Sequence, residues 1–430
     1  MKGRCVQKAD NEYLLPKKMI LPILIVLGIA LLSEEMIFEY TIFQKFLWVF
    51  LALGGAAVLV NQYKKKQGVS IDRLALLSSP IPLVVLMLYT LIRCMFAGDT
   101  IGVAGQAFTT TMYVIVDILM VIALVYRYKE RSIDLLFAGI VVSYAATIVN
   151  AFGNVSFVVL LEYLVKPKDS AHFYFERHDI GIAVVPLILY YLSRWLLLQE
   201  KNFAPGLKKA GILAIIMLLC GKRSAFLGLA AGVAIMVLLL ICRKRTAMVS
   251  RWIMAGCVIL PFLYVCAIRS GALYAVTEFL HINSMGRTEV YEWFSDQYTI
   301  SPLYLGKGFQ YIHRYMRAGL GSDLVNKYDY LHNTVLQLYI EGGFWGFFLW
   351  FGYTAVAMPV LLRKWFSRKV SVFYLVLIVS TIAIFLVDNA LTYPLYQVCL
   401  YGVLGVVLAE NNGKVIRLKL PVFKQKDNSC

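Results

Sequence analysis

The sequence contains a succession of apolar runs that are long enough to cross a bilayer and are separated by short polar segments. A helix needs about 20 apolar residues to span the hydrocarbon core of a membrane. Since 60% of the residues are hydrophobic and only 16% are charged, the chain is typical of a polytopic membrane protein. We expect an all-α fold, with residues 1–430 forming a single integral membrane domain of about twelve transmembrane helices. The predicted spans are 19–33, 46–60, 74–96, 109–126, 133–152, 180–198, 207–221, 224–242, 252–268, 333–362, 371–387 and 390–409.

The net charge of +17 is distributed asymmetrically between the predicted spans. If both termini are cytoplasmic, 29 of the 42 lysines and arginines fall in cytoplasmic segments, as the positive-inside rule requires. Basic tracts such as "KKK" at 64–66 lack the interleaved aromatic residues of nucleic-acid binding. The charge therefore indicates orientation in the membrane, and we expect no nucleic-acid partner. The eight cysteines form neither a disulfide framework nor a metal-type CxxC pair.

Two of the predicted outer connections are long, namely 153–179 and 269–332. The second is rich in Tyr, Trp, His and Arg. Within it, "VTEFLHI" and "RTEVYEWFSDQY" have apolar residues at helical spacing. We expect short helices at the outer surface there, so the polar mass of the protein lies on one side of the membrane.

The motif "LLCGKRSAFLG" at 218–228 places Lys222 and Arg223 in an outer turn, against the charge rule. Arg223 follows the inner-surface residue Lys209 by a helical rise of about 21 Å, which is less than the bilayer core of about 30 Å. We therefore expect Arg223 to be recessed inside the protein. Such an arginine needs an anionic partner, either an acidic side chain such as Asp117 or a phosphate or diphosphate group.

The loop 269–332 carries further candidates. Arg287 follows a glycine and opens an amphipathic segment, which on its own fits an ordinary surface arginine. The segment "SPLYLGKGFQYIHRYM" at 301–316 is a glycine-rich turn with Lys307, followed by Arg314. Lys307 and Arg314 are candidate substrate-binding residues, although a lone GxG is weak evidence of phosphate binding.

The segment "DYLHNTVLQLYIEGGFWGFFLW" at 329–350 opens an apolar helix with an unusually polar face. Asn333, Gln337 and Glu341 fall at i, i+4 and i+8, on one side of that helix. His332 lies at its N-terminus, where the helix dipole disfavours an imidazolium and favours a ring that acts as a base. Alternatively, Asn333 only caps the helix and Glu341 only pairs with a basic residue. The glycines that follow, Gly342, Gly343 and Gly346, are typical of helix packing.

In the other long loop, "FYFERHDIG" places Arg177, His178 and Asp179 at the mouth of a predicted span. They form either a local ion-pair cluster or part of a substrate-binding site.

The order of these motifs is informative. A "KRS", a "GR" with a Trp-bearing segment, "LGKGF" and "HNTVLQLYIEGGFWG" together resemble the superfamily of O-antigen ligases and Wzy-type polysaccharide polymerases. The motifs cover roughly residues 215–355, and the topology covers the whole chain. The "RHDIG" at 177–181 resembles a diverged form of the "HPNxxG" of that family, without its Pro and Asn.

The resemblance implies a GT-C-like, metal-independent glycosyltransferase that requires no cofactor. It implies an active site at the outer face of the cytoplasmic membrane and a donor glycan on undecaprenyl diphosphate. Arg223 and Arg287 would hold the diphosphate, and His332 would activate the acceptor hydroxyl. Apart from the resemblance, we expect contributions to substrate binding from Lys222, Asn333, Glu341, Arg177 and His178. No Asp-x-Asp motif occurs in the predicted outer loops.

Three functions remain open on the sequence. The first is a polymerase of lipid-linked glycan repeat units. The second is a ligase that transfers the finished glycan to lipid A core or to a protein. The third, from another class, is a lipid-linked oligosaccharide flippase or transporter. The partners implied are the lipid-linked donor, a glycan or lipid-linked acceptor, membrane lipids, and a flippase or chain-length regulator.

Overall fold

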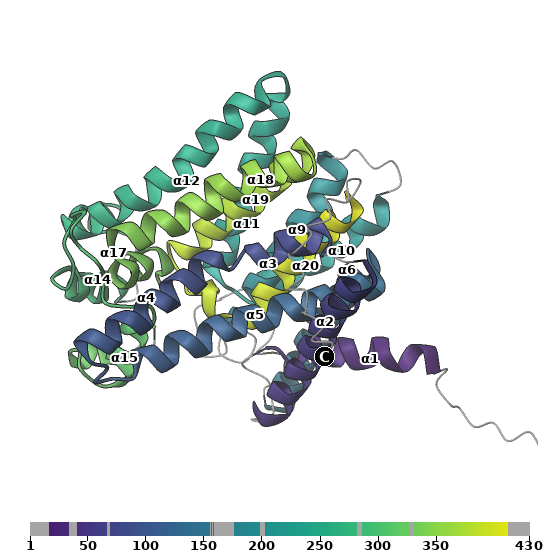
Figure 1. Cartoon of the computed structure of the whole chain (residues 1–430), viewed down its shortest axis with the longest axis horizontal. Coiled ribbons are helices and arrows are strands. Elements are labelled where there is room, and N and C mark those ends of the chain that lie inside the picture. The colour runs from purple at the N-terminus through teal and green to yellow at the C-terminus, as the bar shows by residue number, and fades with distance from the viewer. Residues whose placement is uncertain are drawn as a thin grey trace, which may run out of the picture.

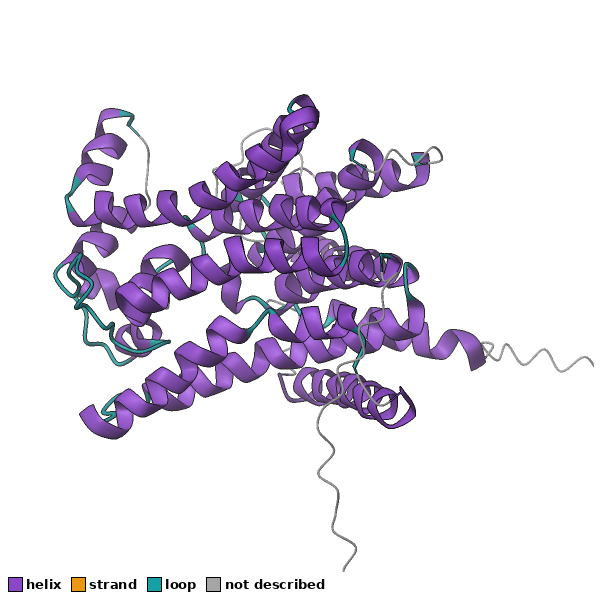
Figure 2. Cartoon of the chain, turned by 45° about the horizontal axis from the view of Figure 1, so that its top comes forward, coloured by secondary structure: helices purple, strands orange, loops and turns teal. Residues whose placement is uncertain are grey.

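The computed structural model describes residues 17–33, 41–66, 69–154, 156, 158, 176–197, 203–281, 286–326 and 330–411. Every regular element within these ranges is helical (Figure 2). The expected all-α class is therefore confirmed. The elements are α1 (Lys17–Ala30), α2 (Thr41–Lys66), α3 (Ile71–Ser78), α4 (Ile81–Ala97), α5 (Val103–Tyr128), α6 (Arg131–Asn154), α9 (His178–Leu196), α10 (Ala204–Leu219), α11 (Arg223–Ile241), η1 (Arg243–Arg245), α12 (Thr246–Arg269), α13 (Ala272–Phe279), α14 (Arg287–Ser295), α15 (Tyr311–Arg317), α16 (Asp323–Asn326), α17 (Thr334–Gly352), the π-helical η2 (Tyr353–Ala357), α18 (Met358–Trp365), α19 (Arg368–Phe385), η3 (Ala390–Thr392) and α20 (Pro394–Glu410).

Each predicted span coincides with a helix or with a pair of consecutive helices. In the described part of the chain, seven helical segments are long and apolar enough to cross a membrane. An eighth is obtained if α3 and α4, which meet at a bend of 41°, form one span. The protein is thus a multi-pass membrane protein, but the number twelve is not established.

The spans differ in how deeply they lie in the molecule. In α9 and α19, 78% of the apolar window is buried, against 28% in the segment that contains α12. The helix α9 packs on α10, α11 and α20, and α19 packs on α11 (Figure 1). These central helices bring the start of α9, the end of α19 and the start of α20 toward one region, which contains the buried Asp388 and the polar side chains around it.

Small residues allow close approach between several of these helices. A Cβ on Gly232 of α11 would lie 2.7 Å from the Leu189 side chain of α9, and one on Gly228 would lie 2.5 Å from Ile384 of α19. On α17, a Cβ on Gly346 would lie 2.7 Å from Leu86 of α4. The prediction that the α17 glycines serve helix packing is confirmed for Gly342 and Gly346, which both face Leu86, and it matches how helices associate in lipid. It is wrong for Gly343, which packs against the backbone of the loop at 304–306.

The predicted outer loop 269–332 contains four short helices, α13 to α16, in its described part. The helix α14 coincides with the predicted "RTEVYEWFSDQY" helix, and α13 overlaps "VTEFLHI". Residues 282–285 and 327–329 lie outside the described residues, as does most of the predicted loop 153–179.

The loop that follows α14 packs and hydrogen-bonds against a kink in α17. Gly343 interrupts the helix at φ 67° and ψ −171°, and Gly306 of the loop has φ 86°. A Cβ on Gly306 would lie 2.4 Å from the Gly343 nitrogen. The Phe344 amide donates to the Tyr304 carbonyl, and the Lys307 amide donates to the Ile340 carbonyl. Only glycine permits both this backbone conformation and this contact.

Candidate active site

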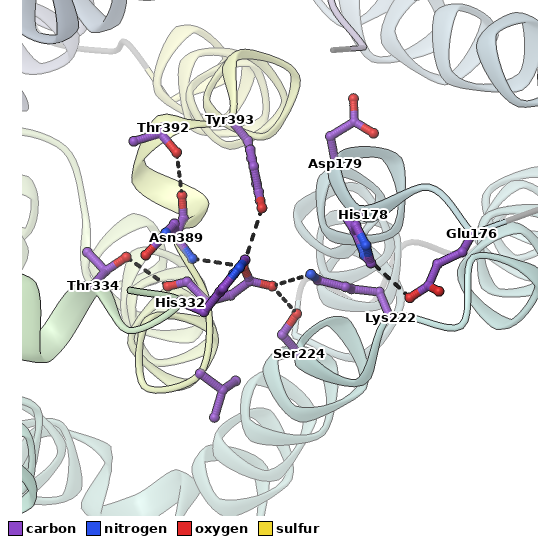
Figure 3. Close-up of polar contacts among 12 residues, drawn as sticks. Glu176, His178, Asp179, Lys222, Ser224, His332, Thr334, Asn389, Thr392 and Tyr393 are labelled. Carbon is purple, nitrogen blue, oxygen red and sulfur yellow. Dashed lines mark hydrogen bonds and ion pairs between the residues drawn. The ribbon is translucent and has the colours of Figure 1, made fainter. Parts of the chain in front are cut away.

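The region is organised by Asp388, which follows α19 and is completely buried. Its Oδ2 accepts a hydrogen bond of 2.7 Å from the Ser224 hydroxyl and forms an ion pair of 2.8 Å with the Lys222 ammonium. Both partners lie at the start of α11 (Figure 3). A buried carboxylate needs such pairing, because the desolvation of an isolated charge is very unfavourable.

The other oxygen of this carboxylate faces a different set of groups. The backbone N–H of Asn389 donates to Oδ1 at 2.8 Å, and the Tyr393 hydroxyl lies 3.4 Å from the same oxygen. The Nδ1 atom of His332 lies 3.6 Å from the same oxygen. Although burial alone would raise the pKa of Asp388, His332, Lys222 and Ser224 together hold it below its usual value. The carboxylate is therefore ionised at neutral pH.

The position of the His332 side chain is set by the backbone conformation of this residue and by hydrogen bonds to the backbone around it. It has φ 52°, a left-handed conformation that is uncommon for residues other than glycine. The Tyr291 hydroxyl donates to its carbonyl at 3.1 Å. Burial raises the pKa of Tyr291 to about 12, so this hydroxyl stays protonated and donates. On the next residues, the Asn333 side chain accepts from the Leu336 amide, and Thr334 donates twice to the Asp388 carbonyl.

His332 and Asp388 differ in accessibility. The His332 side chain is 27% exposed, whereas that of Asp388 is 0% exposed. A substrate can therefore reach the imidazole but not the carboxylate. The pair has the organisation of a base held by a buried acidic residue, the arrangement that activates hydroxyl groups in many enzymes.

The helix α14 brings Arg287 to the same region. Its guanidinium donates to the Val387 carbonyl at 3.1 Å, next to Asp388 in the chain. Gly286, at φ 80°, precedes it and caps the helix. One helix thus supplies both Arg287 and Tyr291 to the segments that carry Asp388 and His332.

The expectation that Arg223 is recessed inside the protein is wrong. Arg223 is exposed, and its neighbour Lys222 is the buried cation. Arg223 forms no hydrogen bond or ion pair with the part of the chain that the structure describes. The alternative of a pairing with Asp117 is also wrong, because the buried Asp117 accepts a hydrogen bond of 2.9 Å from the Trp48 indole.

The "RHDIG" segment lies beside this cluster. A Cβ on Gly181 would lie 3.0 Å from the Lys222 Cβ, so the glycine lets α9 pack against the lysine stem. His178 lies within electrostatic reach of Lys222, Asp388, His332 and Arg287, and 3.4 Å from Glu176 (Figure 3). The Arg177 guanidinium donates to the Thr147 hydroxyl of α6.

The other predicted site residues, Glu341, Arg314 and Lys307, form hydrogen bonds that join loops and helices away from Asp388. The Glu341 carboxylate accepts from the amides of Gln310 and Ile312 and from the Gln337 side chain. It thereby holds the start of α15. The Arg314 side chain of α15 donates to the Ile101 carbonyl ahead of α5, and the Lys307 carbonyl accepts from Arg93 of α4.

Four residues of this cluster were not predicted from the sequence as site residues, namely Asp388, Ser224, Tyr291 and Tyr393. A signal for Asp388 is present, since "VDNALTYP" at 387–394 is a polar break between the last two apolar runs. In the described residues, no three side chains of His, Cys, Asp or Glu are grouped so as to hold a metal ion.

A comparison with protein families gives a match to part of the chain. Residues 210–351 match the model of the Wzy_C family, described as O-antigen ligase. The match covers α11, α14, the loop with Gly306 and most of α17, and it supports the O-antigen ligase/polymerase superfamily. No curated protein matches the chain.

Proposed function

We propose that the protein is a membrane glycosyltransferase that polymerises glycan repeat units carried on undecaprenyl diphosphate. The observation that carries the proposal is the partly exposed His332 beside the ionised, buried Asp388, with the Lys222 ammonium 2.8 Å from that carboxylate and Arg287 bound to the neighbouring Val387 carbonyl. The match to the O-antigen ligase family over residues 210–351 supports the same class of substrate.

The acceptor hydroxyl loses its proton to Nε2 of His332 in this mechanism. Asp388 faces Nδ1 and favours the tautomer that carries its proton there, which leaves Nε2 basic. The 3.6 Å separation is longer than a hydrogen bond, and such contacts commonly tighten in the substrate complex. The hydroxyl oxygen then bonds to the anomeric carbon of the donor.

The bond that breaks joins the anomeric carbon to the diphosphate, and its electron pair goes to the leaving oxygen. Arg287 uses one N–H group on Val387 and keeps the others for the diphosphate. Arg223 is exposed beside Lys222 and adds a second guanidinium. Guanidinium groups bind phosphate oxygens in a bidentate manner and stabilise the developing negative charge.

Lys222 has a different part in this scheme, because its charge is balanced by Asp388. It keeps the carboxylate ionised. His178 and Arg177 at the start of α9 would contribute to substrate binding beside Lys222, and Asn333 would hold the His332 backbone in place. We further propose twelve spans, two cytoplasmic termini and a site that faces outward, as the distribution of lysine and arginine favours.

A ligase is the second candidate, since the matching family model is described as O-antigen ligase. Both reactions use the same donor and the same base, and they differ in the acceptor. We favour the polymerase because a ligase requires a specialised acceptor, whereas a polymerase uses the next repeat unit.

The test uses cells that lack the chromosomal copy, complemented with wild type, His332→Ala, Arg287→Ala or Arg223→Ala at matched membrane levels. Polysaccharide length is read on gels. The proposal predicts long polymer with wild type and single repeat units with each variant. Accumulation of full-length lipid-linked polymer in the deletion strain would instead identify a ligase. Full complementation by all variants would favour the transporter.

A further inference from the structure

A cavity of about 310 Å³, lined by both polar and apolar side chains, lies between Trp48 of α2, Tyr330 and Thr392. It is lined by parts of α2, α5 and η3, by the end of the α1 segment and by the loop before α17. Its volume is at the lower end of the range of about 300–1,000 Å³ for small-molecule sites. Most of these elements precede residue 210 or follow residue 351 and so lie outside the matched family region.

The lining combines aromatic rings with amide and hydroxyl groups. Trp48 and Tyr113 stack with their ring centroids 4.9 Å apart, and Gln106, Thr110 and Gln397 add polar groups. A sugar ring has an apolar C–H face and a rim of hydroxyls, which aromatic faces and amides complement. An acyl chain would leave the polar groups unpaired, at a cost in free energy.

A second groove in the molecule makes the contrast clear. The groove between α4 and α17 is lined by Val85, Leu86, Trp345 and Phe348, with few polar atoms. That groove suits lipid chains. The cavity at Trp48 has a different composition, which suits a polyhydroxylated ligand.

One side chain in the cavity has an unmet hydrogen-bonding requirement. The Gln310 side chain is 1% exposed, and its Nε2 donor has no partner among the described residues. Gln310 also has φ 69°, and its backbone N–H donates to the Glu341 carboxylate at 2.8 Å. A buried donor without a partner destabilises the fold by about 1–3 kcal/mol. Unmet groups and backbone strain of this kind gather at ligand sites.

Two chain segments run from the cavity to the candidate active site. Tyr330 lines it two residues before His332, and Thr392 lines it next to Tyr393, whose hydroxyl faces Oδ1 of Asp388. Figure 3 shows Tyr393 and Thr392 on one side of the cluster and Lys222 on another. The two carboxylate oxygens of Asp388 thus face different groups, with Lys222 and Ser224 at Oδ2, and at Oδ1 the Tyr393 hydroxyl, whose chain neighbour Thr392 lines the cavity.

We infer that this cavity is an acceptor subsite that binds one sugar residue of the incoming glycan and directs its hydroxyl to His332. The inference rests on the proposed function. It assigns the diphosphate to the side of Lys222 and the acceptor sugar to the side of Tyr393. Gln310, Gln106 and the Trp48–Tyr113 pair provide the recognition.

The experiment uses the full chain in nanodiscs. Lipid-linked repeat units extracted from the deletion strain serve as donor, and the oligosaccharide released from them by mild acid serves as soluble acceptor. Gln310→Met removes the donor group at nearly constant size. We expect the acceptor KM to rise roughly 3- to 10-fold with little change in kcat, since one hydrogen bond to the acceptor is lost. The melting temperature should not fall, because an unpaired buried donor has been removed.

Gln106→Met serves as a second variant on the half-buried face of α5, and it should raise the acceptor KM in the same way. Gln62→Met, on α2 about 21 Å along the helix from Trp48, is the matched control and should change neither constant. If both cavity variants keep the wild-type acceptor KM, or lower only the melting temperature, the cavity is not a sugar subsite.

A binding measurement separates this inference from the proposed function. In the His332→Asn background, the oligosaccharide alone is titrated and followed by tryptophan fluorescence. If His332→Asn still transfers glycan at the wild-type rate, the proposed function fails. If it does not transfer but binds the oligosaccharide in a Gln310-dependent manner, both proposals stand. Binding that does not depend on Gln310 or Gln106 overturns the subsite.

Discussion

Two buried carboxylates lie near α17, and they have opposite surroundings. Asp388 is surrounded by ionisable or polar side chains from α11, the loop before α17 and the start of α20, and of these His332 and Tyr393 are partly exposed. Glu341 is surrounded by the amides of Gln310 and Ile312 and by Gln337. The first arrangement can move a proton and hold an anion. The second secures a loop, so burial of an acid alone does not identify a catalytic site.

The largest effect that separates the two regions is expected at His332. His332→Asn keeps a residue that tolerates the left-handed backbone at this position. It removes the base, and we expect kcat to fall by about 10²- to 10⁴-fold with the melting temperature little changed. The measurement is single-turnover glycan transfer with the purified chain. Transfer at the wild-type rate would mean that the Asp388 region is structural, like the Glu341 region.

The second effect concerns the ion pair between Lys222 and Asp388. Asp388→Asn leaves the Lys222 ammonium buried without its partner, which should lower the free energy of unfolding by about 3–5 kcal/mol. Thermal unfolding in detergent measures this loss.

The matched control is the double variant Asp388→Asn with Lys222→Met, which removes both charges. It should recover most of the stability without recovering transfer. Because the fold lowers the pKa of Asp388, the stabilisation by the carboxylate is present above about pH 4 and is lost as pH falls below that value. The double variant should lack this acid-side loss. A single variant as stable as wild type would show that the pair contributes nothing.

The third effect concerns the Glu341 region. Glu341→Gln replaces one acceptor oxygen with an N–H₂ group that faces amide donors. We expect the free energy of unfolding to fall by about 1–3 kcal/mol. The kcat of the folded protein should remain close to that of wild type. A loss of kcat as large as that of His332→Asn, at unchanged stability, would assign Glu341 to the chemistry.

The sequence predicts the helical segments well, because apolar runs of membrane length leave the backbone no alternative to a helix. It also predicts α14 from apolar spacing and the position of His332 at the start of α17. These are local properties, readable within a few turns of chain.

The partners of Asp388 are not local. The hydrogen bond from Ser224 to Asp388 joins residues 164 positions apart, and no periodicity encodes which helices become neighbours. The error at "KRS" has a different origin. Adjacent residues at a helix start point about 100° apart, so a shift of one residue in the helix boundary exchanges Lys222 and Arg223 between buried and exposed positions.

The smallest effect asks whether the helix α14 acts on catalysis through position alone. The Tyr291 hydroxyl donates to the backbone carbonyl of His332 and not to its imidazole. Tyr291→Phe removes that hydrogen bond at constant ring size, a loss of about 0.5–1.5 kcal/mol. If the bond holds His332 in its left-handed conformation, kcat should fall roughly 3- to 10-fold while the donor KM stays constant.

Tyr298→Phe is the matched control, since Tyr298 donates to the Val265 carbonyl of α12 at 3.4 Å and contacts none of the Asp388 groups. It should leave kcat unchanged. Equal effects of the two substitutions on the melting temperature, with no difference in kcat, would mean that Tyr291 only stabilises the loop. A selective fall in kcat for Tyr291→Phe would extend the chemical region to α14, because Arg287 and Tyr291 lie one turn apart on that helix and would act on the leaving group and the base together.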